Sequence, residues 1–247
     1  MTHIAICVWG ICRSTDLTLE SIRTHIFQPL QAAGITYELF LHTYTLYRPY
    51  ENQRAGEEKL QLKNTLWKLL KPDHSSVEDQ DVIDSTLAFE DYRKHGNAWK
   101  EDGSKGFQTL DNHIRALWSL QQVTRMWVPT KDKYDAILYI RPDVKFYSSV
   151  HPSWIQSLTP TTILVPNFHL IDGVNDRFAI GHPSVMKHYG MRFYQAKEYS
   201  NMLVLHSERF LSWSLAMNRI QVQYIPIKFR RIRANGQVCD ADKEIGM

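Results

Sequence analysis

The amino-acid sequence predicts an α/β fold built on a largely parallel sheet. Short apolar runs alternate with helical patterns along most of the chain, and the first three elements form a strand–helix–strand unit. A chain of 247 residues with 43% hydrophobic side chains is long enough to bury a substantial core. We therefore expect a single domain over 1–247, with a central mixed sheet flanked by helices.

The first unit is the clearest part of the prediction. Residues 4–10 are an apolar run that ends at a glycine, which is typical of a buried strand. Residues 13–34 predict a helix that Gly34 can end, and residues 36–44 predict a second strand. A connection of this length makes the two strands parallel and the crossover right-handed. The apolar face of the helix carries Leu19, Ile22, Ile26 and Leu30.

Residues 45–106 differ in kind, because they are polar and show no sustained periodicity. One helix is predicted within them, over 57–71. We expect the segment to be an excursion from the sheet rather than a separate domain.

Regular spacing of apolar residues resumes after Phe107. A long amphipathic helix is predicted from apolar residues spaced by three or four, namely Leu110, Ile114, Leu117, Leu120, Val123 and Trp127. Further strands are expected over 136–141, 161–167, 177–183 and 221–233, and helices over 184–199 and 207–217.

Composition narrows the class of protein. A net charge of +3 is too small to indicate a nucleic-acid partner. Cys7, Cys12 and Cys239 lack metal-ligand spacing and predict neither a disulfide framework nor an oxidising compartment. No apolar run approaches the ~20 residues of a transmembrane helix, and no signal peptide is recognisable. We expect a cytoplasmic protein without a transmembrane segment.

Polar residues follow the first two predicted strands. Gly10 lets the backbone approach a ligand, and Arg13 offers a fork suited to phosphate beside a helix N-terminus. His42, Thr43 and Tyr44 end the neighbouring strand at the same edge of the sheet. A single glycine is a poor match to a dinucleotide-binding motif, and a plain turn with a surface arginine is the alternative.

The strand over 136–141 breaks at Pro142, which delivers Arg141 and Asp143 to the same edge. A carboxylate there can bind a divalent cation that bridges a diphosphate. An arginine can neutralise the same diphosphate without a metal. The structural alternative is an ion pair at the end of a strand.

Four phrases in this order resemble small GT-A glycosyltransferases of large DNA viruses, including chlorella viruses, and related cellular sequences. They are VWGICRS (8–14), ELFLHTY (38–44), YDAILYIRPDVKF (134–146) and GVNDRFAIG (173–181). The resemblance covers most of the chain outside 45–106. It implies a GT-A-like domain with a nucleotide-sugar donor half over 1–150 and an acceptor half over 151–247.

The same resemblance implies transfer of a sugar from a nucleotide-diphosphate sugar, most commonly a UDP-sugar, to a hydroxyl of a glycan or glycoconjugate. It places Gly10, Arg13, Thr43 and Tyr44 near the nucleotide, with Arg141 and Asp143 near the diphosphate. Such enzymes often hold Mn²⁺ or Mg²⁺ with an Asp-x-Asp motif and a C-terminal histidine. Here Asp143 matches the second acid, His206 is the candidate histidine, and Arg141 stands where the first acid is expected.

Acceptor activation needs a base. In a transfer with inversion, a carboxylate takes the proton of the attacking hydroxyl, and Asp172 and Asp176 precede a predicted strand in a suitable loop. Glu208 is a further candidate, although a glutamate there also suits the N-terminus of a helix. His169 is another possible contact, and a lone histidine is more often structural.

Two motifs remain outside this scheme. The acids Asp240 and Asp242 are expected in a solvated tail. The basic segment 228–233 suits either a nucleic-acid-processing enzyme or a charged edge strand. A non-catalytic module that binds a nucleotide or a glycan is the main alternative to a transferase.

Overall fold

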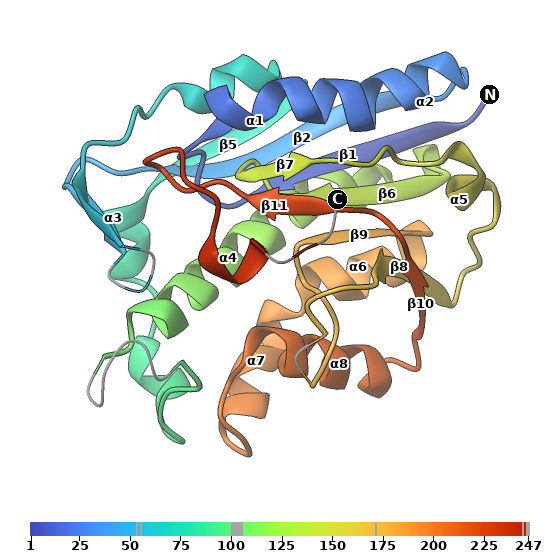
Figure 1. The fold of residues 1–247 in the computed structure, drawn as a ribbon. Helices are drawn as coiled ribbons and strands as arrows, with labels where there is room; N and C mark the ends of the chain where they lie inside the picture. The colour runs from blue at the N-terminus through green and yellow to red at the C-terminus, as the bar shows by residue number, and fades with distance from the viewer. Residues whose placement is uncertain (53, 55, 100–105, 171, 244, 246–247) are drawn as a thin grey trace.

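A computed structural model describes the chain except residues 53, 55, 100–105, 171, 244, 246 and 247 (Figure 1). Its main sheet has seven strands in the order β10-β8-β9-β6-β1-β2-β5. β9 is antiparallel to both neighbours, and all other pairs in this sheet are parallel. The α/β prediction with a largely parallel mixed sheet is therefore confirmed. The strands are β1 (His3–Trp9), β2 (Thr36–Thr45), β5 (His74–Asp79), β6 (Ala136–Ile140), β8 (Thr162–Pro166), β9 (Phe178–Gly181) and β10 (Gln221–Ile225).

The predicted first unit is present as predicted. β1 and β2 pair in parallel from His3–Thr36 to Trp9–His42. The helix between them runs continuously through α1 (Thr15–Ile22), a π-helical turn, η1 (Arg23–Phe27), and α2 (Gln28–Ala32). Gly34 ends it with a φ of +70°, a conformation that favours glycine.

Helices cover both faces of the sheet (Figure 1). On one face, Ile22, Ile26 and Leu30 of the first helix pack against side chains of β1 and β6. On the other face lie α4 (Gln108–Trp127), α6 (Pro183–Met191) and α8 (Ser207–Met217), whose apolar residues form one cluster with the opposite side of the sheet. Outside the segment 45–106, the described chain also contains α5 (Pro152–Gln156), α7 (Phe193–Ser200) and the 3-10 turns η6 (Val128–Lys133) and η7 (Asp240–Asp242).

The segment 45–106 is more closely integrated than predicted. It contains the hairpin β3 (Tyr50–Asn52) with β4 (Glu57–Leu60), and then β5, which joins the edge of the main sheet beside β2. The sequence missed β5 because its residues HSSVED are mostly polar, as a partly exposed edge strand permits. The segment also holds α3 (Gln80–Asp84) and η4 (Phe89–Tyr92).

Two further predictions of secondary structure were wrong. The helix predicted over 57–71 is a strand followed by a 3-10 turn, η3 (Leu66–Leu70), because its N-terminal part pairs with β3. The last strand, predicted over 221–233, is two strands. β11 (Phe229–Arg231) leaves the main sheet and pairs antiparallel with β7 (Val144–Phe146). Pro226 separates them, since proline has no N–H to continue a ladder.

A close contact across α4 and α6 generates a stability prediction. A Cβ added to Gly190 would overlap Thr124 Oγ1 and Tyr139 OH, which are hydrogen-bonded to each other at 2.6 Å. We expect Gly190→Ala to lower the free energy of unfolding by about 1–3 kcal/mol, measured by urea denaturation. Without such an overlap, a Gly→Ala exchange inside a helix raises the free energy of unfolding by up to about 1 kcal/mol. The control is Lys187→Ala, at an exposed position of the same helix.

Candidate functional site

A cavity of about 450 Å³ lies at the carboxyl ends of β1, β2 and β6. Gly10 follows β1, Tyr44 is near the end of β2 and Arg141 follows β6, and all three line it. β2 and β5 extend the sheet on one side of β1, and β6 begins the other side. Open α/β sheets bind ligands at such a reversal of strand order, outside the carboxyl ends of the strands.

The turn after β1 is held rigidly. Gly10 has a φ of +99°, and its N–H donates to Ser119 Oγ at 2.8 Å. Thr43 Oγ1 accepts the N–H of Cys12 at 3.1 Å. Thr43 is fully buried and does not line the cavity, so it positions the turn from behind.

Beneath this turn, His42 joins a serine and a glutamate. Its ring nitrogens lie 2.8 Å from Ser119 Oγ and 2.9 Å from Glu78 Oε2. The residue types are those of a nucleophilic triad, but Ser119 is fully buried and its hydroxyl bonds the His42 carbonyl and the Gly10 N–H. The group therefore braces the turn against α4 and β5.

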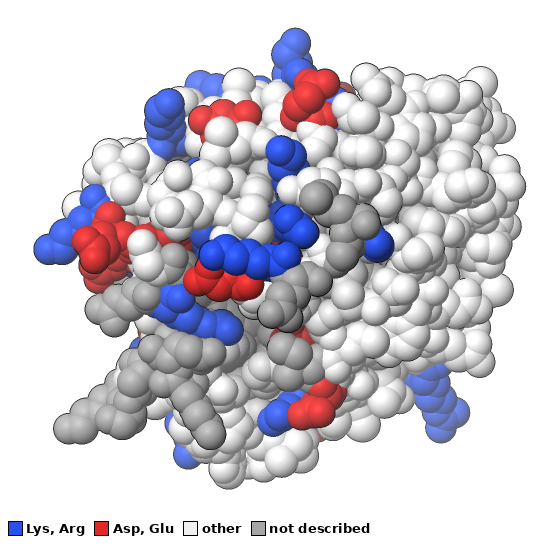
Figure 2. Space-filling model, in the orientation of Figure 1, with Lys and Arg blue, Asp and Glu red and all other residues white. Residues whose placement is uncertain are grey.

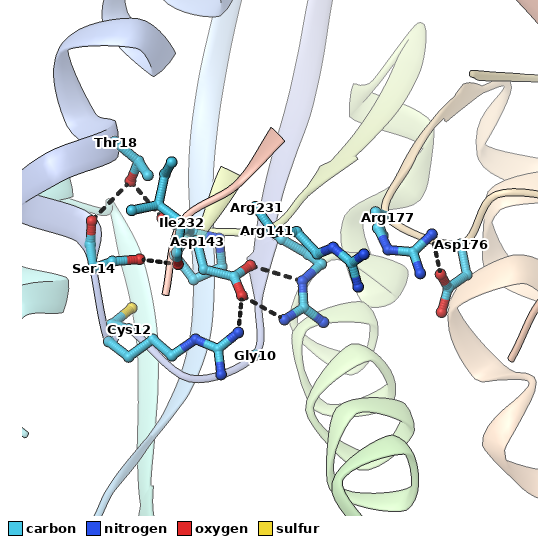
Figure 3. Close-up of polar contacts among 12 residues, drawn as sticks. Gly10, Cys12, Ser14, Thr18, Arg141, Asp143, Asp176, Arg177, Arg231 and Ile232 are labelled. Atoms are coloured by element: carbon cyan, nitrogen blue, oxygen red, sulfur yellow. Dashed lines mark hydrogen bonds and ion pairs between the residues drawn. The ribbon is translucent and has the colours of Figure 1, made fainter. Parts of the chain in front are cut away.

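Asp143 lies between two arginines. Its Oδ1 accepts from Arg141 Nε, and its Oδ2 accepts from Arg141 Nη2 and Arg13 Nη2, each at 2.8 Å. Burial raises the pKa of this carboxyl, but the guanidinium charges of Arg141 and Arg13 outweigh burial and hold the pKa well below its usual range. Asp143 has no exposed atom, and both its oxygens are engaged (Figure 3).

The residues predicted to hold a divalent cation do not fit that role. Asp143 already serves two guanidinium groups, and His206 stacks on Trp99 with its Nδ1 3.4 Å from Glu208 Oε2. Within the described residues, no group of three or more His, Cys, Asp or Glu side chains is arranged to hold a metal ion.

Asp176 presents a carboxylate to the cavity. It is buried, and its Oδ1 accepts no hydrogen bond from any residue that the structure describes. The nearest cation is Arg177 Nη1, 3.5 Å from that oxygen. Burial raises the pKa of Asp176, but the guanidinium charges of Arg177 and Arg192 outweigh burial and bring it below its usual value. The result is an ionised carboxylate with an unused acceptor.

The other two predicted bases lie outside the cavity lining. Asp172 projects outward, with 76% of its side chain exposed, and is paired with Arg209 at 2.8 Å. Glu208 is buried and accepts from Arg177 Nη2 at 2.9 Å and from the Ser207 hydroxyl. His169 contacts Asp242 at 2.9 Å.

The C-terminal acids correct one prediction. Asp240 is exposed, as expected of a solvated tail, but Asp242 is only 1% exposed. Its carboxylate accepts from the Arg231 N–H, Nε and Nη2, and burial is possible because these donors neutralise it. The basic segment 228–233 likewise turns inward, with Arg231 and Arg233 lining the cavity.

The sequence did not reveal several lining residues. Tyr50 and Trp99 come from the segment 45–106, where no periodicity drew attention to them. His113 lies on α4 and is buried, which lowers its pKa to about 4 and leaves it neutral, and its Nε2 makes no hydrogen bond within the described residues. Its place three residues after Leu110 and four before Leu117, on the apolar face, was the available signal.

Arginine dominates the cavity. Among the residues that the structure describes, eight arginines line it, against three acidic residues. The arginines are Arg13, Arg48, Arg54, Arg115, Arg141, Arg177, Arg231 and Arg233, and the acids are Glu51, Asp111 and Asp176. On the face in Figure 2, charged side chains crowd toward the side of α3, and the opposite side carries few.

The chain matches no protein-family model and no curated protein sequence. No helix of the described residues is long and apolar enough to cross a membrane.

The pairing of Asp143 predicts a large effect of its removal. Asp143→Ala leaves the buried guanidinium group of Arg13 and the partly buried one of Arg141 without their shared counter-charge, so we expect the free energy of unfolding to fall by about 3–5 kcal/mol. Urea denaturation measures this. Asp240→Ala, an exposed aspartate, is the control and should change stability by less than about 0.5 kcal/mol. Equal effects of the two changes would contradict the pairing.

The same carboxylate predicts a dependence of stability on pH. Because the folded-state pKa of Asp143 is depressed, its contribution is complete above the unfolded pKa of about 3.9 and is lost as pH falls toward the folded value. We expect the free energy of unfolding to decline below about pH 5. The decline should be shallower in Asp143→Ala, because the variant lacks this titrating group.

Proposed function

We propose that the protein is a glycosyltransferase that moves a sugar from a nucleotide-diphosphate sugar to a hydroxyl of a glycan or glycoconjugate. The observation that carries the proposal is one cavity that combines several arginines with an ionised carboxylate, Asp176, whose Oδ1 has no hydrogen-bond partner among the described residues. A leaving diphosphate requires positive charge, and an attacking hydroxyl requires a proton acceptor.

The shape and chemistry of the cavity support a nucleotide-sized ligand. Its volume of about 450 Å³ falls in the range of small-molecule sites. Tyr44, Tyr50 and Trp99 supply aromatic rings on which a base or a sugar can stack, and Gly10 allows close approach to the backbone. The sequence resemblance to GT-A glycosyltransferases makes UDP-sugars the first donors to test.

The proposed reaction is a displacement at the anomeric carbon. The acceptor oxygen forms a bond to that carbon, while the bond from the carbon to the diphosphate oxygen breaks and the nucleoside diphosphate leaves with the electron pair. Asp176 takes the proton of the acceptor hydroxyl, and arginines stabilise the charge that develops on the diphosphate. With Asp176 as a base and not a nucleophile, the transfer inverts the configuration of the sugar.

The proposed function predicts that the protein binds a nucleotide-sugar donor. We expect one nucleotide sugar from a panel to bind the purified chain by calorimetry and to be hydrolysed slowly when no acceptor is present. Binding of a donor without hydrolysis or transfer to any acceptor would favour a non-catalytic binding module instead. Binding of no nucleotide sugar would contradict the proposal.

The two aspartates of the loop before β9 form a matched pair for a test of the base. Asp176→Asn keeps the shape of the side chain and removes its basicity, so we expect kcat to fall by about 10²–10⁴-fold with donor affinity within threefold. Asp172→Asn should leave kcat unchanged, because that side chain is exposed and outside the cavity lining. Loss of activity in Asp172→Asn, with activity kept in Asp176→Asn, would identify Asp172 as the base.

A further inference from the structure

We infer that the cavity binds a diphosphate through guanidinium groups without a divalent cation, using Arg141, Arg231 and Arg233. Asp143 and Asp242 then act as anchors that orient two of these arginines and not as metal ligands. The inference deepens the proposed function by naming how the diphosphate is held, and it rests on that proposal for the choice of ligand.

One edge of the Arg141 guanidinium group is bound by Asp143. Its Nε and Nη2 both donate to Asp143, which is the bidentate arrangement that fixes the plane of a guanidinium group. The group also lies over the Trp9 ring, 5.2 Å from its centroid. Its Nη1 makes no hydrogen bond to the described residues, and the side chain lines the cavity with 17% exposure. One edge is thus fixed and one is available to a ligand.

Arg231 repeats this arrangement. Its Nε and Nη2 donate to the two oxygens of Asp242, at 2.9 Å and 2.6 Å. Asp242 is fixed in turn by His169. The side chain of Arg231 also lines the cavity, and its Nη1 has no hydrogen bond within the described part of the chain.

The backbone brings the two arginines together. β11 pairs with β7 so that Arg231 lies opposite Val144, and the Ile232 N–H donates to the Asp143 carbonyl at 2.8 Å. In Figure 3, Arg231 projects next to Arg141, with Arg177 and Asp176 beyond them. Two guanidinium groups anchored from behind therefore face one space.

Arg233 adds a cation that is poorly compensated. It makes no ion pair with a carboxylate among the described residues, and its Nη2 donates to Cys239 Sγ at 2.9 Å. Burial lowers its pKa, and the charges of Arg13 and Arg231 lower it further. An anion in the cavity relieves this crowding of like charges.

A divalent cation at Asp143 requires its oxygens to leave Arg13 and Arg141. That exchange removes the carboxylate partner of Arg141 and leaves the buried Arg13 with only the longer contact to Glu57 at 3.5 Å, while arginine forks match phosphate oxygens directly. The geometry therefore favours arginine over a metal as the partner of the diphosphate.

The test is calorimetric titration of the full chain with UDP, in EDTA and then with 1 mM Mn²⁺, and with uridine as a ligand that lacks the diphosphate. We expect UDP to bind in EDTA, Mn²⁺ to change Kd by less than about threefold, and uridine to bind at least about tenfold more weakly. Arg141→Ala should weaken UDP binding about tenfold or more. Arg23→Ala, an arginine on the exposed surface of η1, should leave Kd unchanged.

If Arg141→Ala does not fold, Arg233→Ala serves as the second variant. Arg233 is not paired with a carboxylate among the described residues, so its removal leaves no buried carboxylate unpaired. It should also weaken UDP binding at least threefold. Binding of UDP only with Mn²⁺ would overturn the inference while a metal-dependent transferase stands. A Kd that both variants leave unchanged would also overturn it, because these arginines would then not hold the diphosphate. Binding in EDTA that follows the arginines, without turnover of any nucleotide sugar, supports the inference and overturns the proposed function.

Discussion

The burial of one carboxylate organises this molecule. Asp143 has no exposed atom, so its charge is tolerable only while Arg13 and Arg141 stay bonded to it. The same short segment fixes its neighbours through backbone contacts. Thr18 Oγ1 donates to the Pro142 carbonyl at 2.6 Å, and the Ile232 N–H donates to the Asp143 carbonyl. The turn after β1, the end of β6 and the strand β11 therefore depend on a single ion cluster.

This constraint extends to the segments that look peripheral in the sequence. Arg13 also contacts Tyr50 and lies 3.5 Å from Glu57, which is buried in the hairpin of the segment 45–106. The C-terminal Asp242 holds Arg231 in the same way that Asp143 holds Arg141. The walls of the cavity thus come from different parts of the chain. Arginine–carboxylate contacts join the hairpin to the turn after β1 and join η7 to β11.

The cavity separates two electrostatic environments. Arg141, Arg231 and Arg233 crowd positive charge beside the carboxyl ends of β1 and β6. Asp176 adds an ionised carboxylate. His113 adds a neutral imidazole whose Nε2 makes no hydrogen bond within the described residues. Preorganised charges of both signs are what a displacement with an anionic leaving group and a protic nucleophile requires. Because the fold fixes these groups before any ligand arrives, little reorganisation remains for the proposed reaction.

The sequence by itself determined the elements whose burial is periodic. β1, β2 and α4 follow from apolar spacing, and Gly10, Arg13, Tyr44 and Arg141 follow from the rule that parallel strands end at one edge. Only the tertiary structure decided β5, the inward turn of Arg231, the burial of Asp242 and the isolation of Asp176 from Asp172. These depend on contacts between distant segments, such as the pairing of β11 with β7. Local periodicity carries no information about them, since a polar side chain that is neutralised by a remote partner looks identical in sequence to one that faces water.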